Sequence, residues 1–232
     1  MISSLTNKRV KELCLLKTSK GRKSSGQFIV EGRHLVNEAK ALGILVEVYT
    51  TDEALEGELV SKEVMKKLCN TDTVVNQIGV CKKIESNVIA DRVLILDGVQ
   101  DPGNLGALMR SAKAFDFNTI FLGTGTVDPY NDKVIRSSQG AIFKLSILEG
   151  DVVDFINSLK GYEIYSTNVK NGVSVDEIKK AQKCALILGN EGNGVSDRVN
   201  SLGLKNLYIK ISNTESLNVA VAGSILMYEM SK

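Results

Sequence analysis

Residues 94–114 read LILDGVQDPGNLGALMRSAKA. An apolar run ends at Asp97, a polar loop containing Asn104 follows, and apolar residues recur with helical spacing from Leu105 onward. This is the order of a strand, a loop and a helix. Because backbone N–H groups gather at a helix N-terminus, the loop predicts a site for an anion or a polar ligand, with Arg110 just beyond it.

The composition is that of a globular chain. Of 232 residues, 43% are hydrophobic, enough for one large domain or two small ones. A formal net charge of +2 neither requires nor excludes a nucleic-acid partner. The segment from Lys8 to Arg33 is locally basic, however, since its many Lys and Arg residues face only Glu12 and Glu31.

The cysteine and histidine residues argue against disulfides, a metal site and a histidine-based catalytic triad. The four cysteines form no CxxC pair, which predicts a reduced, cytoplasmic protein. His34 is the single histidine, so we expect no metal site and no Ser-His-Asp triad. No apolar run approaches the roughly 18 to 20 residues of a membrane span, and we expect neither export nor an anchor.

The first part of the chain predicts a small α/β unit. Between its first helix and first strand, residues 19–27 read SKGRKSSGQ and predict a mobile basic loop. Arg22 and Lys23 are its candidate RNA contacts, although an ordinary solvated connection is an equally good interpretation. The predicted elements are helices at 6–16, 34–42 and 61–68 and strands at 28–32 and 46–50.

A break in the apolar pattern places a domain boundary near residue 90. Beyond it, nearly continuous apolar strands predict an α/β domain with a parallel sheet covered on both faces and ligands at the carboxyl ends of the strands. Strands are predicted at 93–96, 119–122, 142–148, 162–166, 184–188 and 207–211, and helices at 105–115, 131–137, 151–159, 195–201 and 216–230.

Two further strand ends carry unusual residues. Residues 188–196 read LGNEGNGVS, and their glycines permit close backbone approach to a ligand. Residues 213–229 read NTESLNVAVAGSILMYE, where several polar residues surround a helix start. A helix cap would explain one of them but not the cluster.

Together with residues 94–114, these two motifs resemble the SpoU (TrmH) branch of the SPOUT methyltransferases. The resemblance implies transfer of a methyl group from S-adenosylmethionine to a ribose 2′-hydroxyl of RNA. It also implies an RNA substrate-binding domain over residues 1–90, with the α/β fold of small ribosomal RNA-binding proteins, and a methyltransferase domain over residues 91–232.

The resemblance further implies a deep trefoil knot near the C-terminus, an exception to the rule that chains do not thread their own loops. It implies a homodimer in which both subunits complete the site. Lys210 departs from the family pattern, which commonly has Pro there. The residues assigned to the cofactor are Thr167, Gly189, Ile209, Ile211 and Leu217.

The catalytic candidates follow from the chemistry and the resemblance. A ribose hydroxyl must lose its proton, and the developing charge must be stabilised. Arg110 is a natural phosphate clamp, and the resemblance implies that it also assists deprotonation. Glu191 is the alternative base, and an equally good interpretation makes it a structural acceptor for loop N–H groups.

Asn104, Asn218 and Ser216 complete the candidate site. The two asparagines can donate to the ribose or orient Arg110, and Ser216 can hold the loop or contact the target nucleotide. Taken singly, Asn104 reads as a helix cap and Asn218 as a first-turn residue. The three motifs together favour the functional interpretation.

The predicted function is therefore RNA ribose 2′-O-methylation. Ribosomal RNA is favoured over transfer RNA because of the added N-terminal domain. A non-catalytic RNA-binding protein on the same scaffold is the first alternative. A phosphate-binding α/β enzyme using residues 189–194 is the second, although no Lys follows those glycines.

Overall fold

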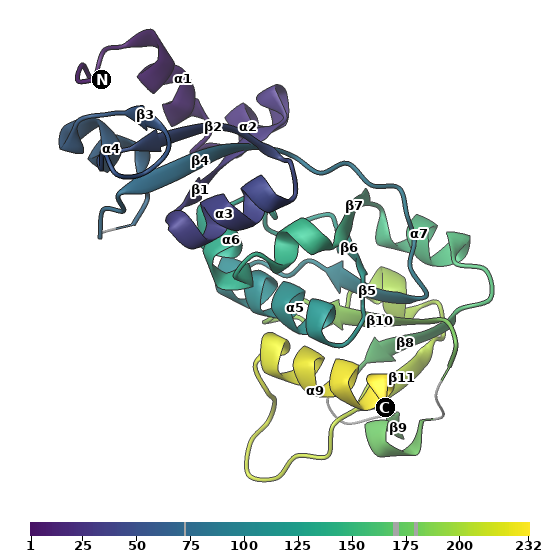
Figure 1. The fold of residues 1–232 in the computed structure, drawn as a ribbon. Helices are drawn as coiled ribbons and strands as arrows, with labels where there is room; N and C mark the ends of the chain where they lie inside the picture. Colours follow the sequence, from purple (N-terminus) through teal and green to yellow (C-terminus); the bar gives the residue numbers. More distant parts are fainter. Residues whose placement is uncertain (72, 169–171, 179–180) are drawn as a thin grey trace. The chain divides into compact units, whose positions relative to one another are not determined.

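The computed structural model describes residues 1–71, 73–168, 172–178 and 181–232 (Figure 1). The chain forms two compact units. One consists of residues 1–84 and 128–143, and the other of residues 85–127 and 144–232. Residues 128–143, which the sequence analysis placed in the second domain, thus pack into the first unit.

The first unit is built on a four-stranded mixed sheet with the order β1-β4-β2-β3. Its core includes Val10 and Leu13 from the first helix, together with Tyr49, Met65 and Ile78. The elements are α1 (Lys8–Leu15), α2 (Ser19–Ser25), β1 (Gln27–Glu31), α3 (Arg33–Ala41), β2 (Leu45–Thr50), β3 (Glu58–Leu59), α4 (Lys62–Leu68), β4 (Gln77–Lys82), α6 (Asp132–Ser138) and the 3₁₀ helix η1 (Ala141–Lys144), which ends one residue into the second unit.

The predicted basic loop is wrong, because residues 19–25 form helix α2. Thr18 caps the helix by accepting from the Gly21 N–H, and Gly26 ends it with φ +65°. The Arg22 side chain is buried and pairs with Asp128 at 2.7 Å. It is therefore committed to packing in the first unit, which leaves Lys23 as the exposed member of the predicted pair.

Aromatic contacts hold residues 128–143 against strand β1. The Phe28 ring lies 4.8 Å from that of Tyr130 and 6.2 Å from that of Phe143, between centroids. Lys83 lies over the Tyr130 ring. The first unit is consequently discontinuous in sequence, which local periodicity could not reveal.

The second unit contains a seven-stranded, all-parallel sheet with the order β7-β6-β5-β10-β8-β11-β9. This confirms the predicted α/β class. The elements are β5 (Arg92–Asp97), α5 (Pro102–Ala114), β6 (Thr119–Gly123), β7 (Ser146–Gly150), α7 (Val152–Ser158), β8 (Glu163–Thr167), β9 (Val173–Ser174), the 3₁₀ helix η2 (Val175–Glu177), β10 (Cys184–Gly189), α8 (Asp197–Asn200), β11 (Lys205–Tyr208) and α9 (Val219–Ser231).

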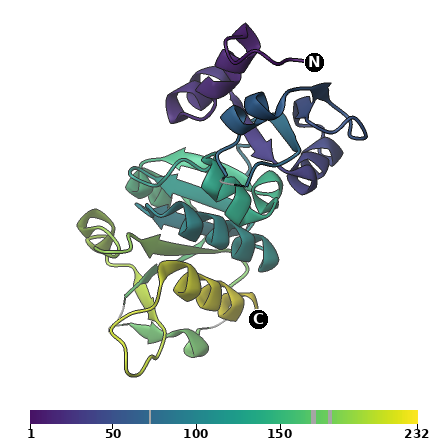
Figure 2. The ribbon, with the colours of Figure 1, turned by 90° about the vertical axis from the view of Figure 1, so that its left-hand side faces the viewer.

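Helices cover both faces of this sheet. Alternate residues of β5 and β10, such as Val93 and Ile187, pack with α7 and α8. On the opposite face α5 and α9 lie side by side (Figures 1 and 2). A Cβ at Gly223 of α9 would come within 2.6 Å of Leu188 and Leu108 side-chain atoms, so this glycine lets α9 lie close to the sheet.

The order of the strands reverses direction between β5 and β10. From β5 the chain runs outward through β6 and β7, and then returns to the other side of β5 for β8 to β11. Adjacent parallel strands whose connections run in opposite directions leave a crevice at their carboxyl ends. Asp97 and Gly189, the last residues of β5 and β10, are paired in register at that point.

Three predicted boundaries are wrong. Strand β11 ends at Tyr208 rather than at residue 211, and α9 begins at Val219 rather than at residue 216. Residues 209–218 are therefore loop, as the polar sequence NTES favours. Residues 142–144 belong to η1, and β7 starts only at Ser146. Within the described ranges, no helix is both long and apolar enough to cross a bilayer.

Candidate active site

A cavity of about 600 Å³ opens at the carboxyl ends of β8, β10 and β11 in the second unit. All five residues predicted to hold the cofactor line it, as do Glu191, Ser216 and Asn218. The five are Thr167 at the end of β8, Gly189 at the end of β10, and Ile209, Ile211 and Leu217 in the loop before α9.

The loop after β10 is folded tightly on itself. Asn190 and Gly194 exchange backbone hydrogen bonds of 2.8 and 2.9 Å. A Cβ at Gly189 would lie only 2.0 Å from the Gly194 carbonyl carbon, so residue 189 must be glycine for this loop to close. Asn190 also donates to the Gly98 carbonyl (2.9 Å), which ties the loop to the end of β5.

A chain of hydrogen bonds joins the three predicted motifs. The Asn218 Nδ2 donates to the Asn104 Oδ1 (3.0 Å), and the Asn104 Nδ2 donates to the Glu191 Oε1 (3.1 Å). Asn218 also caps α9, because its Oδ1 accepts from the Ala220 N–H (2.9 Å). Each amide thus has a fixed orientation, and the loops that begin α5, α8 and α9 are linked.

Both carboxylate oxygens of Glu191 accept hydrogen bonds. Its carboxylate also accepts from the backbone N–H groups of Gln100 (3.1 Å) and Asp101 (3.0 Å). Burial alone would raise the pKa of Glu191, but the hydrogen bonds from Asp101, Asn104 and Gln100 outweigh it and lower the pKa below the ordinary value. A carboxylate held in this way is a weak proton acceptor near neutral pH.

The start of α5 is capped by Asp101 rather than by Asn104. The Asp101 Oδ1 accepts from the Asn104 N–H (2.8 Å), and Pro102 occupies the first turn. Asp101 and Pro102 therefore shape the loop, as their residue types predict. With the cap supplied by Asp101, the Asn104 side chain is free to join the hydrogen-bond chain.

Arg110 and Ser216 are both exposed. Arg110 lies on α5 outside the cavity lining, and no hydrogen bond or ion pair connects it to another residue of the described ranges. Ser216 lines the cavity, and its carbonyl accepts from the Thr214 hydroxyl (3.2 Å). These two side chains are the predicted groups most available to a substrate.

The cavity fits S-adenosylmethionine by size and chemistry. Its volume lies within the roughly 300–1,000 Å³ typical of cofactor pockets. Apolar side chains suited to an adenine ring lie beside backbone segments that can supply N–H and C=O groups. The apolar lining consists of Leu188, Leu207, Ile209, Ile211, Leu217, Val219, Ala222 and Leu226.

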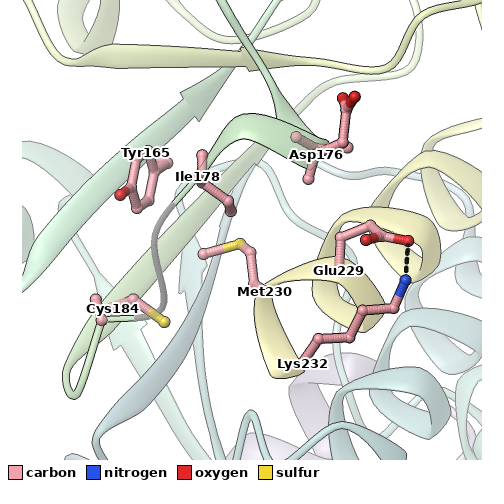
Figure 3. A pocket seen from close by; sticks show the side chains of 9 residues that line it. Tyr165, Asp176, Ile178, Cys184, Glu229, Met230 and Lys232 are labelled. Carbon is pink, nitrogen blue, oxygen red and sulfur yellow. Dashed lines mark hydrogen bonds and ion pairs between the residues drawn. The ribbon is translucent and has the colours of Figure 1, made fainter.

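A second cavity of about 240 Å³ lies near the end of α9 (Figure 3). Of its three charged groups, Glu229 and Lys232 pair with each other at 2.7 Å, and Asp176 accepts a hydrogen bond from the Ser174 hydroxyl. Burial raises the pKa of the Cys184 thiol to about 11, so this thiol is not a nucleophile at neutral pH. No residue predicted to be functional lines this cavity. In the described ranges, no three or more His, Cys, Asp or Glu side chains are placed to hold a metal ion.

Comparison with known families decides the assignment. Residues 91–228 match the SpoU rRNA Methylase family, and residues 7–79 match the MRM3-like substrate binding domain. The chain belongs to the SpoU rRNA methylase family. The resemblance drawn from the three motifs is therefore confirmed.

Relatives of this SpoU protein match along nearly its whole length. The 23S rRNA (guanosine(2553)-2′-O)-methyltransferase RlmP of Bacillus subtilis is 36% identical, over 99% of this chain and 98% of its own. The AdoMet-bound rRNA methyltransferase of Sinorhizobium meliloti superposes with a TM-score of 0.87 at 26% identity, over 99% and 96% of the two chains. A solved RNA 2′-O ribose methyltransferase gives 0.83 at 28% identity, over 99% and 97%.

Sequence reasoning missed the residues that hold the SpoU loops together. Asn190 accepts from the N–H groups of Gly192 and Asn193, at 2.9 and 3.1 Å, besides donating to Gly98. Asp97 accepts from the Ser196 N–H (2.8 Å). The available signal was a polar residue at or directly after each apolar strand, which is where loop-capping side chains are needed.

Proposed function

We propose that this protein transfers a methyl group from S-adenosylmethionine to a ribose 2′-hydroxyl of ribosomal RNA in the cytoplasm. The proposal depends above all on one cavity, which all five predicted cofactor residues line. Residues of the second and third motifs are part of its lining, and Asn104 of the first motif is hydrogen-bonded to Glu191 and Asn218 of that lining. Ribosomal RNA is the substrate in the name of the Bacillus subtilis relative, and in this chain residues 7–79, which match a substrate binding domain, precede the methyltransferase match.

Five residues would hold the cofactor: Thr167, Gly189, Ile209, Ile211 and Leu217. When bound, S-adenosylmethionine supplies an electrophilic methyl group on a positively charged sulfur. Lys210, where relatives commonly have Pro, leaves an N–H donor in this loop. The apolar side chains of the lining exclude water from the adenine ring.

Arg110 is the group that we assign to the ribose. Methyl transfer would form an O–C bond at the 2′ oxygen while the S–C bond to the methyl group breaks, leaving a neutral thioether. The hydroxyl proton would pass to solvent, so negative charge develops on that oxygen. A guanidinium stabilises this charge and can clamp an adjacent phosphate. Arg110 is exposed and engages no other described residue, so it is available for both contacts.

Glu191 and the two asparagines act as positioning residues in this proposal. Glu191 accepts three hydrogen bonds from the loop before α5 and from Asn104, and its lowered pKa disfavours proton uptake. Asn104 and Asn218 transmit that fixed arrangement to the start of α9. Ser216 remains available to the target nucleotide.

We further propose that the protein is a homodimer whose subunits each contribute to the site. Helix α9 is apolar on its outward face as well as its inward one. Val221 and Tyr228 are 49% and 48% exposed there, and Ile225 between them is partly exposed. An apolar stripe of this kind at helical spacing is typical of a helix that packs against another chain.

The domain assignment and the knot complete the proposal. Residues 1–90 would bind the RNA, with Lys23 among the contacts, and residues 91–232 would carry the methyltransferase site. The loops after β10 and β11 would form a deep trefoil knot around the cofactor.

Sedimentation analysis of the wild type and of Val221→Lys tests the proposed homodimer. The added charge on the outward face of α9 is expected to dissociate it.

The activity is tested by incubating the protein with labelled S-adenosylmethionine and RNA from cells that lack it. Because a 2′-O-methyl group blocks alkaline cleavage of the neighbouring phosphodiester, the product is mapped as an alkali-resistant position. We expect label in ribosomal RNA at one such position. Label in transfer RNA alone would mean that transfer RNA, and not ribosomal RNA, is the substrate. If the protein binds RNA but labels neither RNA class, it is a non-catalytic RNA-binding protein.

A further inference from the structure

The first unit contains a cavity that the methyl-transfer site does not use. It has a volume of about 480 Å³ and lies where β1 passes into α3, beside the start of β4. Its lining combines one cation, polar side chains and apolar side chains. The lining residues are Gly32, Arg33, Asp52, Leu55, Val74, Val75, Asn76 and Gln77.

One side of this cavity suits an anion. Helix α3 begins at Arg33, and its N-cap residue is Gly32, with φ +91° and no side chain to satisfy the first N–H groups. No atom lies within 4 Å of the position a Gly32 Cβ would take, so the backbone is open to close approach. Arg33 is exposed and has no hydrogen-bond or ion-pair partner among the described residues. A helix N-terminus and a free guanidinium together favour a phosphate.

The other side presents acceptors and apolar surface. Gln77 is 6% exposed, and its Nε2 donates to the Glu56 carbonyl (2.8 Å), while its Oε1 has no partner. A buried acceptor without a donor is uncommon and indicates a place for a donor from a ligand or water. The Asp52 carboxylate also lines the cavity, and Val74 leaves 37% of its surface exposed there.

We propose that this cavity binds one unpaired nucleotide of the RNA. The phosphate would lie at Arg33 and the start of α3, and the base would pack on Leu55 and Val74 with its N–H edge toward Asp52 and Gln77. A nucleobase needs apolar contacts on its faces and hydrogen-bonding groups at its edge, and it is accessible in this way only when unpaired. The proposal rests on the proposed function in one respect, which is that the substrate is RNA.

The test uses the full-length protein and a short fluorescent RNA, either single-stranded or in a duplex. Fluorescence anisotropy gives the affinity of each for the wild type, Arg33→Ala and Val74→Glu, at salt concentrations from about 50 to about 200 mM. Lys66→Ala is the matched control, because Lys66 is an exposed cation of α4 outside the cavity lining. All three substitutions are at exposed positions, so folding is expected to be retained and is checked by thermal unfolding.

We expect Arg33→Ala to weaken single-strand binding about tenfold and to reduce the slope of log K against log salt by about 0.7, the value for one phosphate contact. Val74→Glu should weaken it at least as much, and Lys66→Ala by no more than about twofold. The proposal is overturned if Arg33→Ala and Lys66→Ala have equal effects. It is also overturned if Arg33→Ala weakens duplex binding as much as single-strand binding, since the contact would then be with phosphate alone.

Titration of the same variants with S-adenosylmethionine separates this proposal from the proposed function. Cofactor affinity is expected to be unchanged in Arg33→Ala, because the cofactor cavity lies in the other unit. A wild type that binds no cofactor would defeat the methyltransferase proposal while leaving the RNA measurements valid. Normal cofactor binding with unaltered RNA affinity in Arg33→Ala would defeat the nucleotide pocket alone.

Discussion

Substitution of Gly189 by alanine is expected to damage the cofactor cavity severely. The added Cβ would lie 2.0 Å from the Gly194 carbonyl carbon and 2.1 Å from the Val195 nitrogen, more than an ångström inside an ordinary contact. The crowded atoms are backbone, and the hydrogen bonds between Asn190 and Gly194 hold them in place. Relief therefore requires the loop to move away from the end of β10.

Overpacking of this kind typically costs about 1–3 kcal/mol of stability. Because the displaced loop forms one wall of the cavity, we also expect the affinity for S-adenosylmethionine to fall at least about tenfold. Urea unfolding measures the first effect and calorimetric titration the second. Gly192→Ala is a matched control, since a Cβ at that position of the same loop would come no closer than 3.6 Å to any atom.

The unfolding midpoint of Gly192→Ala should equal that of the wild type. If Gly189→Ala also unfolds like the wild type and binds the cofactor within about twofold of it, the loop is not packed as described. Gly189 would then not be required for the wall of the cavity.

Three further predictions concern individual contacts. Asn218→Ala removes the cap of α9 and should lower the free energy of unfolding, measured in urea, by about 1 kcal/mol. Asn218→Asp keeps the cap but loses the donor to Asn104, so this variant should be as stable as the wild type and should lose methyl transfer. Arg22→Met leaves the Asp128 carboxylate, only 14% exposed, without its charged partner and should cost about 3–5 kcal/mol. Arg136→Met, at the more exposed pair with Asp132, should cost less than about 1 kcal/mol, and equal losses would contradict the burial of the first pair. The folded-state pKa of Glu191 is lowered, so its contribution to stability is present above its unfolded-state pKa and is lost as the pH falls through the folded-state value. Glu191→Gln should therefore destabilise the protein at pH 7, and its stability should approach that of the wild type as the pH falls through the folded-state pKa of Glu191. Its methyl-transfer rate should be reduced about tenfold or less. A loss of about a hundredfold or more with a changed pH profile would make Glu191 the base instead.

Most of the second unit could be predicted from sequence because its signals are local. Its strands are short apolar runs, and Asp97 and Gly189 mark where two of them end. The cofactor residues came from the motif resemblance, and the cavity gathers all of them. The orientation of the Asn104 amide was not predictable, since it depends on Glu191 and Asn218, far away in sequence.

The errors in the first unit have the same cause. The sequence SKGRKSSGQ has the composition of a loop, yet it forms α2, where Arg22 pairs with Asp128 from 106 residues further along the chain. Propensity is a weak guide where a tertiary contact of this kind compensates for poor helix formers. Strand β4 was missed for a related reason, because Gln77 and Gly79 interrupt its apolar pattern.

The central claim is tested most directly by calorimetric titration of the purified protein with S-adenosylmethionine, paired with methyl transfer to ribosomal RNA by the wild type and by Arg110→Ala. We expect both proteins to bind the cofactor with similar affinity, because Arg110 lies outside the cavity lining, and only the wild type to transfer the methyl group. Absence of binding to the wild type, or undiminished transfer by Arg110→Ala, would contradict it.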